Sequence, residues 1–408
     1  MWALAWRNVW RHKTRSLVAC GAVAAAVAFT LVFFGFVEAT KTGMFEVLTS
    51  DSGHLQITSS RAEGAPDFDS RLIRHAAQVE AALLQELRDV QLRRVLEVPA
   101  LISGETRARG ALVVGMAHDD ALGERSARKH VAAGRLPAPG SWDEIALGEA
   151  LARALQVELG DPIYVFAPGT EGWGAAAYTL VGLLDFPQTS YEIQVAYLSL
   201  EGAQLLAAPG AVTRLEVHLS PSRGVPTDTL IEETKARAAA VLGPDVRVQT
   251  WREAAPDMAA MLDMMDPGMT IFAFLIFVLA GLLVVNTIYL SLVERIREFG
   301  VIIALGADRW RVMRMVLAES LVLVLAGTAA GLLVGGALIA GWADGFRMPG
   351  LDEVLAEFGL PVVLYPSVTP VQVAVTIAYA VFTALAAALW PAWVAGRLQP
   401  VEAMRHVA

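Results

Sequence analysis

The chain has 408 residues, of which 55% are hydrophobic and 18% are charged, and its formal net charge is −9. Soluble domains carry about a quarter charged residues, so this composition excludes an ordinary soluble protein and indicates that lipid is part of the solvent. The apolar excess lies in four blocks, and the rest of the sequence has the composition of a globular domain.

The first ten residues place three tryptophans on one stripe of a helix. Trp2, Trp6 and Trp10 follow one another at a spacing of four residues, with Arg7 beside them. Indole rings prefer the headgroup region, so we predict an amphipathic interfacial helix over residues 1–16 at the cytoplasmic surface of the membrane. An aromatic belt without a mechanical role is the alternative interpretation.

Four apolar blocks are long enough to cross about 30 Å of hydrocarbon as helices. They predict transmembrane helices at residues 17–37, 269–293, 317–342 and 371–394. The first block contains no charged residue and is longer than the apolar region of about 7–15 residues in a cleaved signal peptide. We therefore expect it to remain in the protein as a membrane anchor.

Basic residues set the predicted orientation, because Lys and Arg near the ends of spans are retained on the cytoplasmic side. They cluster before the first span and in the segment 294–316, whereas the loop 343–370 is acidic and has Arg347 as its one basic residue. We therefore expect a multi-pass protein of the cell inner (cytoplasmic) membrane. Both termini, including a tail at 395–408, are expected in the cytoplasm.

Residues 38–268 then form a large extracytoplasmic domain. This segment holds 32 of the 41 acidic and 20 of the 32 basic residues, so its formal charge is −12. Its pattern of short strands and amphipathic helices is typical of an α+β domain, and Pro and Gly near 137–140 and 209–210 delimit an inserted lobe at about 141–208. The predicted fold class is an α-helical membrane protein with four transmembrane helices. A two-lobe α+β domain lies between the first and second helices.

Individual elements of this domain follow from hydrophobic periodicity. Strands are predicted at residues 54–58, 111–115, 162–166, 178–184, 195–198, 214–219 and 246–249. Helices are predicted at residues 75–88, 148–156, 201–206 and 227–242, and another runs from residue 251 towards the second span.

Motifs that would give the chain a chemistry of its own are absent from the sequence. None of its four lysines lies in a G-x-x-x-x-G-K-[ST] loop, so the sequence has no such phosphate-binding loop for ATP. No H-E-x-x-H or G-x-S-x-G motif occurs, and we predict neither catalytic nor metal-binding residues. The apolar blocks at 17–37, 269–293, 321–342 and 371–394 contain no Asp, Glu, Lys, Arg or His, which disfavours an ion-coupled transporter. We therefore expect the energy for any work to come from a partner protein.

The most specific signal follows the second span and reads E-R-I-R-E-F-G-V-I-I-A-L-G-A over residues 294–307. It predicts a short interfacial helix between two spans that can receive a push from a cytosolic protein. Membrane orientation alone explains the arginines. It does not explain the two glutamates, the two glycines or the apolar run at 301–305.

This segment resembles the E-R-x-R-E-[IF]-G-x-x-x-A-L-G-A signature of the permease superfamily that contains the lipoprotein-release (LolC/LolE), macrolide-export (MacB) and cell-division (FtsX) membrane subunits. The resemblance covers the whole chain, and one departure is Ile303, where the family often has arginine. Further matches are L-A-W-R-N-V at 4–9, R-S-L at 15–17, Glu319-Ser320, and P-V-E-A-M-R at 400–405.

The resemblance implies an ABC permease of the mechanotransmission type, nearest to the lipoprotein-release branch, that is not itself an enzyme. Two such subunits, alike or different, would pair in the membrane and dock a dimer of a cytosolic ABC ATPase, which would bind the ATP and Mg. Movement of the ATPase would then move the extracytoplasmic domain. The ATPase-coupling residues would be Glu294, Arg295, Arg297, Glu298, Phe299, Gly300, Leu305 and Gly306.

The resemblance further implies extraction of lipoproteins from the inner membrane. Membrane lipid and a periplasmic carrier or adaptor protein would be further partners, and no nucleic acid is expected. The apolar substrate cleft would lie near the outer ends of the first two spans. Its lining would be Phe33, Phe34, Phe36, Met264, Met265, Met269 and Phe272. Methionine adapts to varied apolar partners, and a filler role in packing is the alternative for these methionines.

Two other functions stay open at this point. One is the export of a peptide, antibiotic or other amphiphile with an adaptor protein, and the other is FtsX-like regulation of cell-wall enzymes. The loop 167–177 is short and glycine-rich, whereas the lipoprotein-release branch has a longer hook in this region. The substrate and the choice between a homodimer and a heterodimer do not follow from the sequence.

Overall fold

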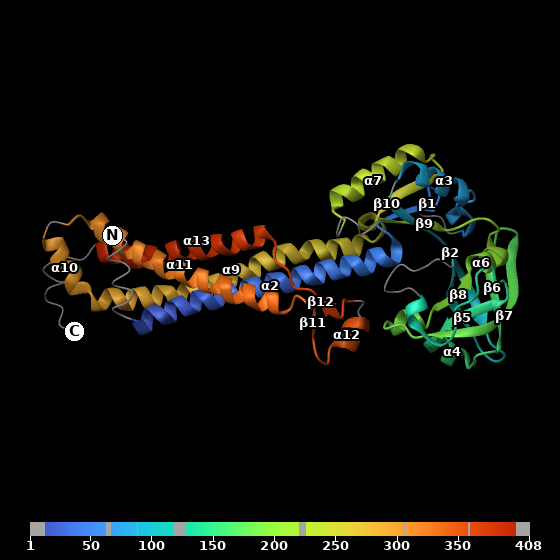
Figure 1. Cartoon of the computed structure of the whole chain (residues 1–408), viewed down its shortest axis with the longest axis horizontal. Coiled ribbons are helices and arrows are strands. Elements are labelled where there is room, and N and C mark those ends of the chain that lie inside the picture. The colour runs from blue at the N-terminus through green and yellow to red at the C-terminus, as the bar shows by residue number, and fades with distance from the viewer. Residues whose placement is uncertain are drawn as a thin grey trace. The chain divides into compact units, whose positions relative to one another are not determined.

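The computed structural model of the chain describes residues 13–62, 67–87, 89–117, 127–219, 226–305, 307–357 and 360–396. The helix predicted at 1–16 lies mostly outside these residues, and so do Gly306, the motif at 400–405 and most of the tail. The chain divides into two compact units (Figure 1). The helical unit comprises the residues up to Lys41, Leu262–Arg347 and those from Val363 onward, and the α/β unit comprises Thr42–Met261 and Met348–Val362.

Four long helices carry the apolar blocks of the sequence. They are α2 (Lys13–Ser52), α9 (Pro256–Glu294), α11 (Arg309–Gly341) and α13 (Pro370–Gly396). Each is long and apolar enough to cross a membrane, which confirms the four predicted spans. The candidate spans within the described residues are Ser16–Ser50, Pro256–Glu294, Trp310–Gly341 and Pro370–Ala395.

Helices α2 and α9 are much longer than a bilayer requires. They have 40 and 39 residues, which corresponds to about 60 Å each, twice the thickness of the hydrocarbon layer. The boundaries predicted after Val37 and before Met269 are therefore not helix ends, because α2 continues to Ser52 and α9 already begins at Pro256. Those boundaries mark where the apolar composition stops, and the helical backbone extends beyond it.

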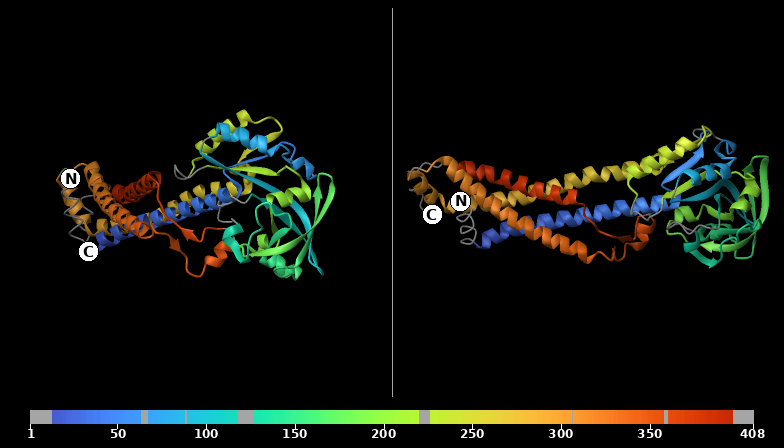
Figure 2. Two further views of the ribbon diagram at one scale, coloured as in Figure 1. Left: turned by 45° about the vertical axis from the view of Figure 1, so that its right-hand side comes forward. Right: turned by 45° about the horizontal axis from the view of Figure 1, so that its top comes forward.

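The two helices run side by side (Figure 2). The rings of Phe33 and Phe272 lie 4.4 Å apart, and Lys41 Nζ forms an ion pair with Asp266 Oδ1 at 2.7 Å. Pro267 lies inside α9 without ending it. Each helix contributes residues to both units, so the backbone is helical where α2 and α9 pass from one unit to the other; the chain also passes between the units at 347–348 and 362–363, outside helices.

Small residues bring α11 close to α2. A Cβ atom added at Gly327 would lie 2.8 Å from the carbonyl oxygen of Cys20, and one at Gly331 would lie 2.6 Å from that of Ala24. Gly335 continues this stripe one turn later, against Ala28. A glycine at every fourth position lets two helix backbones approach closely, as is common between membrane helices.

The start of α13 is fixed by a capping box. The backbone N–H of Gln372 donates to Thr369 Oγ1 at 3.2 Å, and the N–H of Thr369 donates to Gln372 Oε1 at 2.9 Å. Pro370 occupies the first helical position, where a missing N–H costs nothing. Gln372 Nε2 also donates to Glu38 Oε2 on α2 at 3.1 Å, which ties the first and fourth membrane helices together.

The α/β unit is built on a sheet of ten strands in which β3 and β8 pair in parallel. The path runs β10-β1-β9-β2-β3-β8-β5-β7-β4, with β6 on β2 and β7. The strands are β1 (Leu55–Ser59), β2 (Val90–Ser103), β3 (Ala108–Met116), β4 (Val131–Gly134), β5 (Glu144–Gly148), β6 (Pro162–Gly169), β7 (Gly172–Leu184), β8 (Val195–Ser199), β9 (Arg214–Leu219) and β10 (Val246–Thr250).

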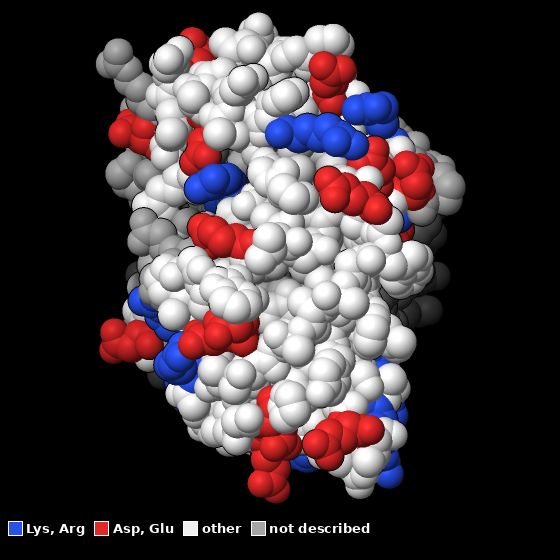
Figure 3. Space-filling model, turned by 90° about the vertical axis from the view of Figure 1, so that its right-hand side faces the viewer, with Lys and Arg blue, Asp and Glu red and all other residues white. Residues whose placement is uncertain are grey.

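Helices cover this sheet. Helix α6 packs against five strands around β3, and α7 packs on β10 beside α3. Figure 3 shows one face of the unit, on which charged side chains surround a largely uncharged centre. The helices are α3 (Ala76–Glu86), α4 (Glu149–Leu155), α5 (Thr189–Glu192), α6 (Leu200–Ala207), α7 (Asp228–Val241), α8 (Trp251–Ala254) and α12 (Asp352–Glu357).

Every strand and helix predicted in this domain is present, but three strands were not predicted. β2 is the longest strand, with 14 residues, and it pairs with β3, β6 and β9. Its arginines, Glu97 and Pro99 interrupt the alternation that marks a strand, which explains the omission. The short strands β4 and β5 were also missed. The lobe predicted at about 141–208 shares this one sheet, since β8 pairs with β3 and β7 pairs with β4.

A buried carboxylate joins β2 to β9. Glu216 is fully buried; its Oε2 accepts from Arg93 Nε at 2.5 Å and its Oε1 accepts from Arg214 Nε at 2.6 Å. Arg214 also pairs with Glu97 Oε1 at 2.7 Å, and His218 Nε2 lies 3.6 Å from Glu216. Burial acts to raise the pKa of Glu216, but His218 and the two arginines outweigh it and lower that pKa to about 2.

The end of α2 and the start of α8 meet beside this cluster. The Phe45 and Trp251 rings make an edge contact at 5.4 Å, and Trp251 N–H donates to the His54 carbonyl oxygen at 3.1 Å. His54 Nδ1 accepts from the N–H of Leu219 at 3.2 Å, which requires an unprotonated Nδ1. Burial, with a smaller contribution from His218, lowers the pKa of His54 to about 4.

We predict that Gly331→Leu destabilises the helical unit while Gly336→Leu does not. The first side chain would collide with Ala24 and Val27 of α2, whereas a Cβ at Gly336 meets no atom within 4 Å. Overpacking of this kind costs about 1–3 kcal/mol. Thermal unfolding of the two variants in detergent, followed by tryptophan fluorescence, measures the difference. Equal midpoints would contradict close packing between α2 and α11.

We also predict that the α/β unit loses stability on acidification. Between pH 6.5 and 4 the unfolded chain protonates His54 and the folded chain does not, so the free energy of unfolding falls by about 3 kcal/mol as pH falls through this window. The contribution of Glu216 is complete above pH 4.5 and is lost as pH falls towards 2.

Denaturant unfolding of the full chain at a series of pH values tests this prediction. His54→Asn keeps an acceptor near the Nδ1 position but removes the titration. The slope of stability between pH 6.5 and 4 should flatten in this variant. An unchanged slope would exclude His54 as its source.

Candidate functional site

A short helix connects the second and third membrane helices. α10 (Ile296–Ala304) follows α9 after the single residue Arg295 and precedes α11, whose N-cap is Asp308. It corresponds to the short helix expected between Glu294 and Leu305. Nine residues are too few for a stable helix in isolation, so packing must hold it.

The inner face of α10 belongs to the core of the helical unit. Phe299 is 2% exposed and lies in one cluster with buried residues of α9 and α11, such as Leu292 and Val316. Gly300 is buried beside it. Ile303, where the family often has arginine, also packs against this core. The helix therefore rests on an apolar base.

The outer face of α10 carries an exposed apolar stripe. The stripe consists of Val301 and of Leu305, the C-cap residue; they follow the exposed Arg297 at intervals of four residues, which places all three on one side of the helix. Val301 is 44% exposed and Leu305 is 84% exposed. Among the predicted coupling residues, Glu294 and Glu298 are also exposed. Apolar side chains displayed on a fixed helix form a surface suited to a protein partner.

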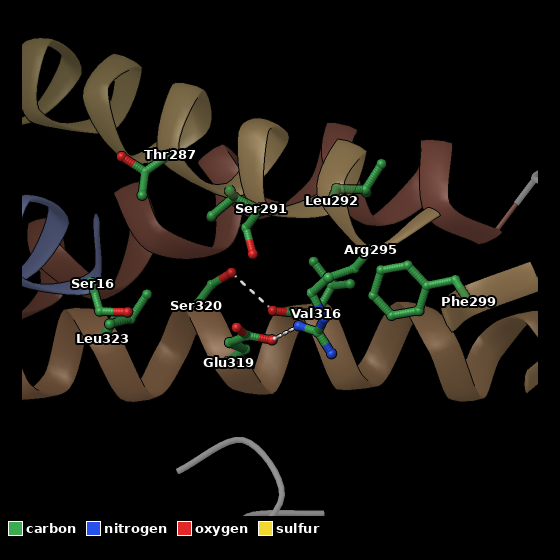
Figure 4. A pocket seen from close by; sticks show the side chains of 11 residues that line it. Ser16, Thr287, Ser291, Leu292, Arg295, Phe299, Val316, Glu319, Ser320 and Leu323 are labelled. Atoms are coloured by element: carbon green, nitrogen blue, oxygen red, sulfur yellow. Dashed lines mark hydrogen bonds and ion pairs between the residues drawn. The ribbon is translucent and has the colours of Figure 1, made fainter. Parts of the chain in front are cut away.

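Arg295 lies at the junction of the three helices (Figure 4). Its Nε donates to Glu298 Oε2 of α10 at 3.1 Å, and its Nη1 donates to Glu319 Oε2 of α11 at 3.0 Å. The guanidinium also lies over the Phe299 ring, 5.0 Å from its centroid. The side chains of Arg295 and Glu319 are 9% and 17% exposed, so this ion pair is shielded from water, whereas Glu298 is 47% exposed.

A small cavity of about 40 Å³ opens beside the ion pair. It offers room for about one water molecule. The hydroxyl of Ser320 on its wall donates to the carbonyl oxygen of Val316 at 2.9 Å (Figure 4). Its lining is Ser16, Thr287, Ile288, Ser291, Leu292, Arg295, Phe299, Val316, Glu319, Ser320 and Leu323.

The structure brings the predicted coupling residues together but adds one that the sequence did not single out. Glu319 matched the superfamily motif, yet no role was predicted for it. It is the partner of Arg295 across 24 positions of sequence. An acidic residue near the start of an apolar helix was the available signal.

The predicted cleft residues separate into several groups. Phe34 and Met269 are buried with Ala273 in a small apolar cluster, so they support packing. Phe33 packs against this cluster, with its ring 6.4 Å from that of Phe34, and also contacts Phe272, which is 39% exposed.

The remaining cleft residues lie elsewhere on the two helices. The Phe36 ring packs in a different aromatic cluster, against the rings of Trp342 and Phe346. Met264 lies more than one turn before Met269 on α9 and is 74% exposed, and Met265 is half-buried. The seven residues thus belong to more than one side-chain cluster of the described part of the chain.

One acidic group among the described residues has the spacing of a metal site. Carboxylate oxygens of Glu149, Asp185 and Glu192 lie within 4.8 Å of one another. Burial raises the pKa of Glu192, which accepts a hydrogen bond from the N–H of Ala150 and lies 3.7 Å from Arg153. Through these contacts Glu192 links α5 to α4, which gives it a structural role.

Comparison with known families gives two matches. The sequence model of the MacB-like periplasmic core domain matches residues 16–237, and that of the FtsX-like permease C-terminal domain matches residues 270–400. The first covers more than half of the chain. The second includes α10 and the Arg295–Glu319 pair.

Individual relatives agree with these matches. The lipoprotein-releasing system transmembrane protein LolC of Xylella fastidiosa (strain 9a5c) is 25% identical over 366 residues, which cover 85% of this chain and 83% of that protein. An uncharacterized ABC transporter permease of Mycobacterium tuberculosis is 25% identical, with 88% and 90% covered. The crystal structure of the periplasmic region of MacB from Actinobacillus actinomycetemcomitans matches over 53% of this chain and 97% of that chain, with 11% identity and a TM-score of 0.36.

Proposed function

The chain belongs to the family of ABC transporter permeases with a MacB-like periplasmic core domain and an FtsX-like C-terminal domain, and from this we propose that it transmits the motion of a separate cytosolic ATPase to its α/β unit. It is a multi-pass membrane protein. Family membership implies an ATPase partner and another permease subunit, alike or different. ATP and Mg would bind to the ATPase.

The observation that carries this proposal is the exposed apolar stripe of α10. Leu305 and Val301 face outward from a helix whose other face is buried with Phe299. A partner that contacts this stripe pushes on α9 and α11 together, because α10 connects them over a short stretch of chain. The residues proposed to contact the ATPase directly are therefore the exposed ones, and the buried Phe299 and Gly300 would hold the helix in place.

We propose lipoproteins as the substrate class, extracted from the inner membrane into the periplasm. The support is the likeness to relatives named as lipoprotein-releasing proteins, which extends over most of both chains. Within this chain, the half-exposed Phe272 paired with Phe33 is an apolar surface that acyl chains would contact. Completion of a cleft would require the second permease subunit, since the seven predicted residues do not line one cavity here.

Export of an amphiphile through an adaptor protein is the second candidate. The observation that favours it is the tight hairpin between β6 and β7, where Gly169 pairs with Gly172. No long hook for a periplasmic carrier extends from this turn. FtsX-like regulation of cell-wall enzymes would need no transported substrate at all.

Reconstitution distinguishes these functions. The chain and the ABC ATPase from the same genome are placed in vesicles that contain a triacylated lipoprotein, and ATP is added. We expect ATP-dependent release of the lipoprotein and stimulation of hydrolysis by it. Stimulation by amphiphiles with an adaptor, and not by the lipoprotein, would favour export. Hydrolysis that neither substrate alters would contradict both transport functions.

We predict that Leu305→Asp weakens association with the ATPase by about tenfold or more, because it places a charge in the proposed contact. Thermal stability should not change, since Leu305 is 84% exposed. Affinity capture of the ATPase on the permease in detergent measures the effect. The matched control is Leu84→Asp on α3, which is 52% exposed and should leave association unaltered. Equal capture by both variants would exclude α10 as the docking element.

A further inference from the structure

Arg295 and Glu319 connect α10 to α11. Arg295 is also the single non-helical residue between α9 and α10, where the backbone can act as a hinge. We propose that this ion pair is the joint through which displacement of α10 is passed to the third membrane helix, and that Glu319 is a positioning residue for coupling. The inference rests on the proposed function, because it assumes that the ATPase acts on α10.

The need for a joint follows from the backbone between α9 and α10. The two helices are separated by Arg295 alone, whose φ of −106° and ψ of 10° are not helical. A single non-helical residue lets a short helix rotate against a long one. A force on the outer face of α10 would be absorbed in part by this rotation; the buried Phe299 opposes it, and a side chain bound to both α10 and α11 opposes it further.

The guanidinium of Arg295 provides this restraint. One edge binds Glu298 on α10 and another binds Glu319 on α11, so three consecutive helices meet at one planar group. A guanidinium fixes two carboxylates with defined geometry, which a lysine ammonium does not. The Phe299 ring beneath it limits movement of the group away from α11.

Burial makes the Arg295–Glu319 ion pair stronger than the Arg295–Glu298 ion pair. Glu319 lies within the candidate span Trp310–Gly341, where an unpaired carboxylate is costly. Its side chain is 17% exposed and that of Arg295 is 9% exposed, so water screens their attraction little. The bond from Arg295 to Glu298 reaches solvent, since Glu298 is 47% exposed, and exposed pairs contribute little.

The two glutamates therefore form a matched pair for experiment. Both accept a hydrogen bond from Arg295 at nearly the same distance. Glu319 belongs to α11, whereas Glu298 belongs to α10. Glu319→Gln keeps the shape of the side chain and removes its charge, and Glu298→Gln does the same on α10. Glu319→Ala removes the acceptor altogether and shows whether the amide of the first variant still holds Arg295.

The test uses the full-length permease in complex with its ATPase in lipid nanodiscs. Three quantities are measured for each variant: capture of the ATPase, the rate of ATP hydrolysis, and the difference in deuterium uptake of the α/β unit with and without a non-hydrolysable ATP analogue. For Glu319→Gln and Glu319→Ala we expect capture and hydrolysis within about twofold of wild type. The ATP-dependent difference in uptake should fall about fivefold or more, a size typical of coupling through a side-chain network. Glu298→Gln is expected to lower capture, because the exposed Glu298 is proposed to contact the ATPase, but to retain the difference in the complexes that form.

The outcomes separate the joint from the docking role. An ATP-dependent difference that persists in both Glu319 variants overturns the joint. Loss of ATPase capture in these variants also overturns it, because Glu319 would then serve docking, and the proposed function would stand. A wild-type complex that captures no ATPase refutes the proposed function, and the joint with it. Unaltered protection of the β-sheet amides shows that each variant is folded.

Discussion

The structure depends on one constraint, which is that a backbone in lipid must satisfy its own hydrogen bonds. The apolar blocks are therefore helical, and in α2 and α9 the helix continues well past the apolar part into the α/β unit. Two of the four chain connections between the units are therefore helical. A displacement at the end of α9 is carried along its hydrogen-bonded backbone, whereas a loop would absorb it. This continuity supports the proposed transmission of motion.

The helical unit is arranged so that such a displacement is shared. Glycines at 327, 331 and 335 bring α11 onto α2, and Gln372 ties the start of α13 to Glu38 of α2. α10 closes the other end, with Phe299 in the common core and Arg295 between α10 and α11. A push on α10 therefore reaches helices that contact one another along their length.

Much of this architecture was predictable because it is written in local composition. The four spans follow from apolar length, the strands of the α/β unit from alternation, and α10 from its charges and glycines. The span bounds predicted at Val37 and Met269 follow the loss of apolar residues, and the helical backbone continues beyond both. β2 was missed because its arginines and Glu97 pair with β9, a contact between residues more than a hundred positions apart.

In the candidate site, too, the features set by local sequence were predicted and those set by contacts between distant residues were not. Residues of α10 were found from the motif, since their spacing on one helix is local. The partner Glu319, the burial of Phe299 and the separation of Phe36 from the other cleft residues depend on which helices pack together. Composition contains little information on that packing. The stripe of glycines in α11 was a readable signal for one such contact and was overlooked.

Transmission through α2 is tested most directly by four glycines inserted after Lys41, where the helix passes from one unit to the other. The measurement is the ATP-dependent difference in deuterium uptake of the α/β unit, in the complex with the ATPase. The insertion should abolish this difference while ATP hydrolysis continues. A difference as large as that of the wild-type chain would contradict transmission through a continuous helix.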